Sequence, residues 1–207
     1  MKGPIEAVVF DIGGVLLDWN PRYLYRQLFE DEEEMERFLA EICTLEWHEA
    51  HDRGKPFDVS CAELAAQHPE YAEQIRAWGQ RSEEMVAGPL EGTVEILRRL
   101  KADGLLCYAL TNMETETFPL RVERFPFMSW FDGVVVSAFE GVIKPDPEIF
   151  RRLIERFNLN PEATLFVDDA QRNVDAARQF GIQAVLFRSP REFERLLSEL
   201  GLLKAAA

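Results

Sequence analysis

Short apolar runs that end in polar side chains recur along this chain of 207 residues. Four of them have the length of strands that are buried on both faces, and they cover residues 7–10, 106–110, 134–136 and 164–167. The polar groups that follow them are Asp11, Thr111, Lys144 and the pair Asp168 and Asp169. In a parallel sheet the carboxyl ends of the strands share one edge, where open α/β proteins place their ligands. We therefore expect these side chains to converge in one cleft.

The stretch between the first two runs has a helical pattern. From residue 21 to residue 86 no β-branched run appears, and apolar side chains recur at helical spacing. We expect helices near 24–29, 35–42, 44–54, 60–67 and 69–86. Asn20 and Pro21 suit the N-cap and the first position of the first helix, and Gly88 and Pro89 should break the chain after the last one.

After this block, helical stripes and apolar runs alternate again, and a further strand is expected at 184–187. Repeated strand–helix units predict a parallel sheet with helices on both faces. The predicted fold is therefore α/β, with a Rossmann-like parallel-sheet core formed by residues 1–16 and 88–207. A small α-helical cap, residues 17–87, is inserted into that core.

The composition restricts the partners of the chain. Its net charge of −14 argues against a nucleic-acid partner, which requires a basic surface. The apolar runs are far too short to cross a membrane, and the first four residues are too few and too polar for a secretory signal. The three cysteines, Cys43, Cys61 and Cys107, make no disulfide framework, so we expect them to be reduced and the protein to be cytoplasmic. Nothing in the sequence indicates an oligomeric state.

The order carboxylate, threonine, lysine and acidic pair resembles the haloacid dehalogenase (HAD) superfamily of hydrolases. The stretches 142–150 and 166–174, with Ala177 and Gly181 after the second, carry the resemblance as well. An insertion of helices directly after the first strand is where the members with a helical cap carry it. Within the superfamily the chain looks most like the glucose-1-phosphate-phosphatase-like group and the N-terminal phosphatase of epoxide hydrolases.

This resemblance implies a Mg²⁺-dependent phosphomonoester hydrolase that acts on a small phosphorylated metabolite, a sugar phosphate being one candidate. Asp11 would be the nucleophile and would pass the phosphoryl group to water through an aspartyl phosphate. Mg²⁺ would neutralise the approach of two anions, held by Asp11, by the carbonyl of Gly13 and directly by Asp169. Asp168 would bind the ion directly or through water.

The remaining core motifs would serve the phosphoryl group. Thr111 and backbone N–H groups near Asn112 would hydrogen-bond its oxygens, and Lys144 would pair with Asp11 and with the transferring group. Asn173 comes after the acidic pair by about one helical turn, so it could orient Asp11 or Lys144, with plain helix capping or exposure to solvent as the alternatives.

One position departs from the usual pattern of HAD phosphatases. Most of them carry a second aspartate two residues after the nucleophile as general acid–base, whereas this chain has Gly13 there. Glycine cannot move a proton, and general acid–base catalysis is typically worth about 10²–10⁴-fold. A subset of sugar-phosphate phosphatases in the superfamily shares this glycine and remains hydrolytic. A good leaving group, a water molecule or a neighbouring group could compensate.

The predicted cap should select the substrate. Residues 47–54 resemble a cap loop that reaches into the cleft, and Arg53 is expected to hold a second group of the substrate. Trp19, between core and cap, is expected to line the entrance to the site, with packing as the simpler alternative. His48 and His51 have a spacing that could bind a metal, but no third ligand is evident, and a packed pair is the simpler interpretation.

Two other functions compete with the phosphatase hypothesis. A 2-haloacid dehalogenase usually has tyrosine at the position of Gly13 and Ser/Asn in place of Asp168 and Asp169. A non-catalytic binding protein on a HAD scaffold would explain the missing acid, but Asp11 and Lys144 are both present.

Overall fold

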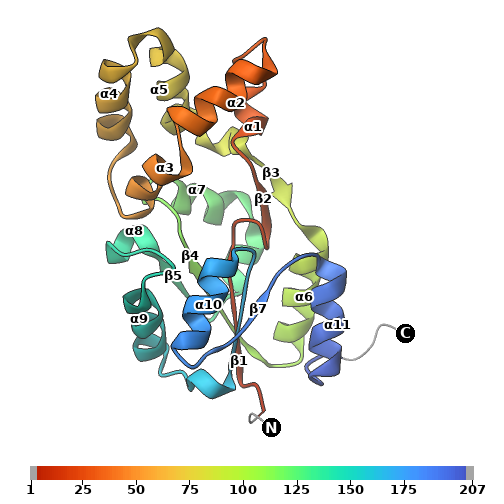
Figure 1. Cartoon of the computed structure of the whole chain (residues 1–207). Helices are drawn as coiled ribbons and strands as arrows, with labels where there is room; N and C mark the ends of the chain where they lie inside the picture. Colours follow the sequence, from red (N-terminus) through yellow and green to blue (C-terminus); the bar gives the residue numbers. More distant parts are fainter. Residues whose placement is uncertain (1–3, 204–207) are drawn as a thin grey trace.

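The computed structural model describes residues 4–203, and its centre is a five-stranded sheet in which all neighbouring strands are parallel (Figure 1). The strands lie in the order β5-β4-β1-β6-β7, with bounds Gly133–Val136, Leu106–Thr111, Ala7–Phe10, Thr164–Asp168 and Gln183–Leu186. The expected α/β fold is confirmed. The prediction ended β4 and β6 one residue early, because Thr111 and Asp168 are polar although both still belong to strands.

Helices cover both faces of this sheet. On one face α6 (Glu91–Ala102) and α11 (Pro190–Glu199) pack over the β1 side chains Val8 and Phe10. On the other face α9 (Pro147–Phe157) and α10 (Gln171–Gln179) pack over Val9. Successive side chains of a strand point to opposite faces, so a strand covered on both sides must be apolar throughout.

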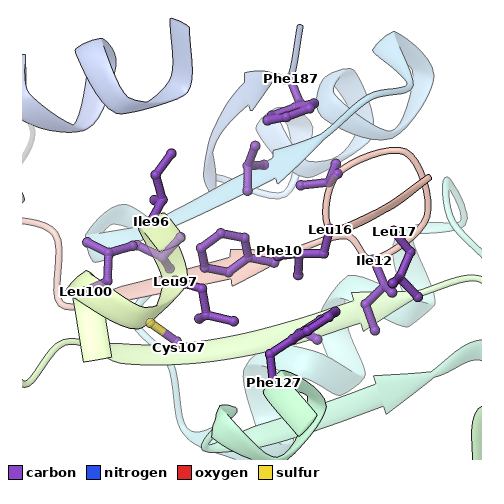
Figure 2. Close-up of a cluster of buried hydrophobic side chains, with 14 of the residues drawn as sticks. Phe10, Ile12, Leu16, Leu17, Ile96, Leu97, Leu100, Cys107, Phe127 and Phe187 are labelled. Atoms are coloured by element: carbon purple, nitrogen blue, oxygen red, sulfur yellow. The ribbon is translucent and has the colours of Figure 1, made fainter. Parts of the chain in front are cut away.

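The first of these clusters surrounds one aromatic ring. In Figure 2, Phe10 lies among Ile96, Leu97 and Leu100 of α6 and beside Cys107 of β4. Phe10 is fully buried, and burial of a side chain of this size stabilises a protein by about 1.5–3 kcal/mol. The apolar packing therefore fixes the strand immediately before Asp11.

Shorter elements complete the part of the chain that carries the sheet. They are α7 (Thr117–Arg124), α8 (Ser137–Glu140) and 3₁₀ turns at Pro126–Trp130 and Pro161–Ala163.

None of the helices within residues 4–203 combines the length and the apolar character that crossing a membrane would require.

The helices of residues 22–80 gather at one end of the molecule, at the top of Figure 1. They are α1 (Arg22–Tyr25), α2 (Glu32–Glu41), α3 (Leu45–Asp52), α4 (Phe57–Gln67) and α5 (Ala72–Gln80), with 3₁₀ turns at Pro69–Tyr71 and Ser82–Met85. They enclose an apolar cluster of their own around Tyr25, Phe38 and Trp78. The division into a core and a cap at residues 17–87 remains our proposal, and we keep the word cap for these residues.

Two of the expected helices are shorter than predicted. Expected at 24–29, α1 ends at Tyr25, and the helix expected over 69–86 is divided between two 3₁₀ turns, α5 and the start of a strand. Pro21, and not Asn20, is the N-cap residue of α1, although the Asn20 side chain one position earlier accepts a hydrogen bond from the Arg22 N–H at 3.0 Å. Helical spacing alone could not show where the turns tighten.

A two-stranded antiparallel ribbon joins the two regions, and the sequence did not predict it. It pairs β2 (Leu17–Trp19) with β3 (Val86–Pro89), with Leu17 opposite Pro89. Gly88 and Pro89, expected to break the chain, therefore lie within a strand. Segments of three and four residues are too short to show a strand pattern, and only their pairing reveals them.

Candidate active site

Three of the residues expected at the sheet edge form one charged cluster. The Lys144 Nζ lies 2.8 Å from Asp11 Oδ1 and 2.8 Å from Asp168 Oδ2, and all three side chains are buried. Strand register accounts for this arrangement, because Phe10 of β1 pairs with Val167 of β6, so the aspartate after each of them emerges at the same edge. The expected convergence of these groups is thus observed.

Lys144 is positioned by Asn112. The Asn112 Nδ2 donates to the Lys144 carbonyl at 3.1 Å, and the Lys144 N–H donates to Asn112 Oδ1 at 2.8 Å. Thr111 is buried at the end of β4, and its hydroxyl donates to the Asn112 carbonyl at 3.4 Å. The structure therefore commits the Asn112 side chain to the lysine loop.

The two acids of the predicted pair differ sharply in their surroundings. Asp168 is fully buried and accepts hydrogen bonds from Lys144, from Asn173 Nδ2 at 3.0 and 3.1 Å, and from the Ala170 N–H at 2.8 Å. Asn173, expected to orient Asp11 or Lys144, thus holds Asp168 instead. Burial acts to raise the pKa of Asp168, but the charge of Lys144 and these hydrogen bonds hold it below its usual value.

Asp169 is exposed and lies against the turn after Asp11. A Cβ atom on Gly14 would lie only 2.3 Å from Asp169 Oδ2, and Gly14 has a φ of +71°, so this turn requires glycine. Partial burial, and then the charge of Asp168, raise the pKa of Asp169. Its carboxylate therefore faces the site with fewer partners than that of Asp168.

The acids fit a divalent cation. Asp11, Asp168 and Asp169 each offer a carboxylate oxygen, and these atoms lie within 4.8 Å of one another. Burial raises the pKa of Asp11 well above its usual value, and the charges of Asp168 and Asp169 add to this effect while Lys144 opposes it. A single ammonium group leaves three carboxylates incompletely neutralised, and oxygen ligands in this number suit Mg²⁺.

A cavity of about 280 Å³ opens above this cluster. Its floor includes Asp11, Gly13, Lys144 and Asp169 at the sheet edge, and its roof includes Trp19, His48 and Asp52 from the cap. Trp19 thus lies where it was expected, and its ring stacks on the His48 ring at 5.5 Å between centroids. The cavity is thus lined by residues of the sheet edge and of the cap together.

Arg53, the expected substrate contact, does not line this cavity. Its side chain is 48% exposed, and its Nη2 lies 3.8 Å from Glu49 Oε2. The arginines that do line the cavity are Arg121 and Arg172, which sequence reasoning missed. No local pattern distinguishes them from other helical arginines.

The histidine pair is buried, and the partners of His48 come from distant segments. His48 Nε2 lies 3.1 Å from Glu114 Oε1 and 3.9 Å from Asp52 Oδ1, while Trp78 Nε1 donates to His48 Nδ1 at 3.1 Å. Sequence reasoning did not single out Glu114 or Asp52. Glu114 comes after β4 and meets His48 only because the cap packs over the sheet edge.

The parallel-sheet fold, with a cluster of three acids and one lysine at its carboxyl edge, is the arrangement that the resemblance to the HAD superfamily implied. Residues 5–181 match the haloacid dehalogenase-like hydrolases, and the chain belongs to that family. The expected resemblance to the HAD superfamily is thus confirmed, and the chain is a HAD-like hydrolase. The narrower likeness to the glucose-1-phosphate-phosphatase-like group stays a prediction.

Two curated relatives that the chain matches over most of their length are named as phosphatases. The sesquiterpene phosphatase astK of Aspergillus oryzae is 31% identical over 178 residues, which cover 86% of this chain and 87% of the relative. The phosphorylated carbohydrates phosphatase of Thermotoga maritima is 27% identical over 190 residues, 87% of this chain and 84% of the relative. These relatives support phosphatase activity on phosphorylated compounds.

Solved structures confirm the fold. A HAD-like family hydrolase of Porphyromonas gingivalis has a TM-score of 0.74 at 21% identity, covering 98% of this chain and 100% of that one. The magnesium complex of a HAD family enzyme of Bacteroides thetaiotaomicron has a TM-score of 0.73 at 20% identity, covering 94% and 99%. At identities this low, the likeness shows that the fold is shared and shows nothing more.

Proposed function

We propose that this protein is a Mg²⁺-dependent phosphomonoester hydrolase that acts on a small phosphorylated metabolite through an aspartyl phosphate on Asp11. The observation that carries the proposal is the buried contact of Asp11 with Lys144, beside the Asp168 and Asp169 carboxylates. Phosphatase names among the relatives support the reaction class. The cavity above Asp11, about 280 Å³, suits a small substrate.

When bound, Mg²⁺ would offset the repulsion between the phosphoryl group and the carboxylates. Asp11, Asp169 and the carbonyl of Gly13 would hold it, with Asp168 directly or through water. We assign the direct contact to Asp169 because the oxygens of Asp168 already accept hydrogen bonds from Lys144, Asn173 and Ala170. The role of Asp168 would then be to hold the lysine.

The chain's own residues would perform the transfer. A carboxylate oxygen of Asp11 would form the bond to phosphorus, while the Lys144 ammonium would stabilise the negative charge on the transferring group. The Thr111 hydroxyl and the backbone N–H groups near Asn112 would hold its remaining oxygens. Because Asn112 fixes the Lys144 backbone from both sides, the lysine needs little reorganisation to act.

The substrate is proposed to carry further polar groups that contact the wall of the cavity. Arg172 and Arg121 line the cavity together with Trp19, and a sugar phosphate would offer them hydroxyl groups. Arg53 lies outside the lining, so we propose that it contacts only a substrate long enough to extend past Glu49. A relative named for phosphorylated carbohydrates supports this class of substrate.

The test is phosphate release from an aryl phosphate and a panel of sugar phosphates, with and without Mg²⁺. We expect turnover that requires Mg²⁺ and is lost with a chelator, and no release of chloride from 2-chloropropionate. Chloride release without phosphate release would favour the dehalogenase alternative. An absence of both activities, with a ligand bound at Asp11, would favour a binding protein on this scaffold.

A further inference from the structure

The proposed hydrolase lacks a proton donor beside its nucleophile. Gly13 has no side chain, and a Cβ atom built there would meet no atom within 4 Å, so the space above Asp11 is open. The cavity that includes this space is also lined by two buried carboxyl groups, Asp52 from the cap and Glu114 from the segment after β4. The surroundings of Asp52 favour the protonated form, whereas those of Glu114 favour the ionised form.

Asp52 is fixed against the carboxyl edge of the sheet. It is the last residue of α3, which packs on α8, and the Ser137 hydroxyl at the start of α8 donates to the Asp52 carbonyl at 2.7 Å. Two residues later a Cβ atom on Gly54 would lie 2.9 Å from the Ala138 carbonyl, so the residue there must be glycine for the chain to approach so closely. This docking brings a cap carboxyl group to the site.

The carboxyl group of Asp52 is suited to the neutral acid form. The residue is 6% exposed, and among the residues that the structure describes its Oδ1 has no hydrogen-bond partner. The titratable groups around it are Glu49 and His48 of its own helix, Glu114, and Lys144 below. Burial raises the pKa of Asp52 to about 7, and the charges of Glu114 and Glu49 add to this effect while Lys144 opposes it.

Glu114 is held in the ionised form. Its carboxylate accepts hydrogen bonds from His48 Nε2 at 3.1 Å and from the Thr117 hydroxyl at 2.5 Å. Burial acts to raise the pKa of Glu114, but these bonds and the charge of Arg121 lower it to about 2. Two neighbouring carboxyl groups whose pKa values are driven apart are the arrangement from which acid and base roles are assigned.

His48 is a positioning residue in this cluster. The Trp78 indole N–H can only donate, so His48 Nδ1 must accept, and the proton of the neutral ring lies on Nε2, toward Glu114. A metal ion on Nε2 would require the proton on Nδ1, where it would face the indole N–H. The ring therefore donates a hydrogen bond to Glu114. Asp52 is then the carboxyl group of this cluster that is left to act as an acid.

We infer that Asp52 is the general acid–base of this hydrolase and replaces, from the cap, the carboxyl group missing at Gly13. The inference rests on the proposed phosphatase function. In the first step, Asp11 forms a bond to phosphorus, the bond from phosphorus to the leaving oxygen breaks, and Asp52 gives its proton to that oxygen. In the second step, the Asp52 carboxylate takes a proton from water as the water oxygen attacks phosphorus. The bond to Asp11 then breaks, phosphate leaves, and both side chains return to their starting forms.

Asp52→Asn tests the inference with two substrates, 4-nitrophenyl phosphate and an alkyl sugar phosphate, in the presence of Mg²⁺. We expect kcat/KM for the alkyl ester to fall by about 10²–10⁴-fold, because its leaving group needs the proton. For the aryl ester kcat/KM should change by less than about threefold, because nitrophenolate leaves without one. A burst of nitrophenol equal to the enzyme concentration should appear, since the second step also loses its base.

Glu46→Gln is the matched control, because it removes one carboxylate from the exposed side of the same helix. Both activities should stay at the parental level in it. Retained aryl activity and an unchanged melting temperature show that Asp52→Asn is folded, and Asp52→Glu should recover part of the alkyl activity. Equal losses for both substrates in Asp52→Asn, or no loss for either, would overturn the inference.

The pH dependence of the parent enzyme gives a measurement that needs no variant. Because the protonated acid is the active form, kcat/KM for the alkyl ester should fall as the pH rises through about 7, the pKa of Asp52. The aryl ester should lack this decrease. A parent that hydrolyses neither ester would refute the phosphatase function itself, whereas parental turnover that depends on Asp11 but not on Asp52 would refute only this inference.

Discussion

The sheet edge and the cap contribute to one cavity in different ways. At the edge, Asp11 and Asp168 are neighbours because β1 and β6 are hydrogen-bonded in register. In the cap, Asp52 reaches the cavity only because α3 docks on α8 through side-chain and backbone contacts. Backbone pairing thus positions the groups proposed for phosphoryl transfer, and tertiary packing positions the group proposed for proton transfer. Substitutions at the sheet edge should therefore impair phosphoryl transfer, whereas substitutions in the cap should impair proton transfer.

Replacing the nucleophile should have the largest effect. Asp11→Asn should lower kcat for every phosphate ester by at least about 10³-fold, because no other carboxylate can form the covalent intermediate. Stability should not suffer, since burial already disfavours the charged form of this side chain. Steady-state kinetics and thermal unfolding measure the two effects. Activity within tenfold of the parent would refute the nucleophile assignment.

The two acids of the pair should affect different properties: Asp168 the stability of the fold, and Asp169 the affinity for Mg²⁺. Asp168→Ala leaves the buried Lys144 with one carboxylate fewer, and breaking a buried ion pair costs about 3–5 kcal/mol in the free energy of unfolding. Asp169→Ala should leave folding nearly unchanged and raise the Mg²⁺ concentration for half-maximal activity by about tenfold or more. Denaturant titration and Mg²⁺ titration of both variants decide the question, and the reverse pattern would mean that Asp168 is the direct ligand.

An acid supplied by the core should substitute for the one supplied by the cap. Gly13→Asp introduced into Asp52→Asn should recover alkyl phosphate kcat/KM by about tenfold or more, because the new side chain enters open space close to Asp11. Gly13→Asn in the same background has the same shape without the acid, and it should recover nothing. Equal rates in the two double variants would show that the position of the cap, and not proton transfer, limits turnover.

Arginines around the cavity entrance should have the smallest effects. Arg172→Ala should lower kcat/KM for the best sugar phosphate several-fold, because Arg172 lines the cavity. Arg53→Ala should change it by less than about threefold unless the substrate extends past Glu49, and neither variant should affect the aryl ester. Comparing both variants on both substrates is the measurement. A larger loss in Arg53→Ala than in Arg172→Ala would mean that the cap closes further over a bound substrate.

Groups at strand ends could be predicted from the sequence, whereas groups that reach the site through packing could not. Asp11, Lys144 and the acidic pair were identifiable because each comes after an apolar run. Asp52 lies in the stretch 47–54 that was expected to reach into the cleft, but nothing distinguished it from its polar neighbours there. Glu114 lies in a segment with no signal, and its contact with His48 forms only after the cap has folded over the edge. The role of the Asn112 side chain was missed for the same reason, since its partner is the backbone of a distant loop. The expected core and cap boundary could not anticipate the β2–β3 ribbon, whose strands are separated by the whole cap.

That ribbon has a consequence for how the cap can vary. Because Leu17 lies opposite Pro89, the chain leaves the sheet-bearing region and returns to it at adjacent points. The Leu90 N–H also donates to the Leu16 carbonyl at 2.8 Å, which continues the contact on the side of the sheet. A segment that starts and ends at one place can lengthen, shorten or be exchanged without altering the register of the five parallel strands. The ribbon is therefore a natural junction for grafting a different helical segment, and with it a different substrate preference, onto an unchanged set of core residues.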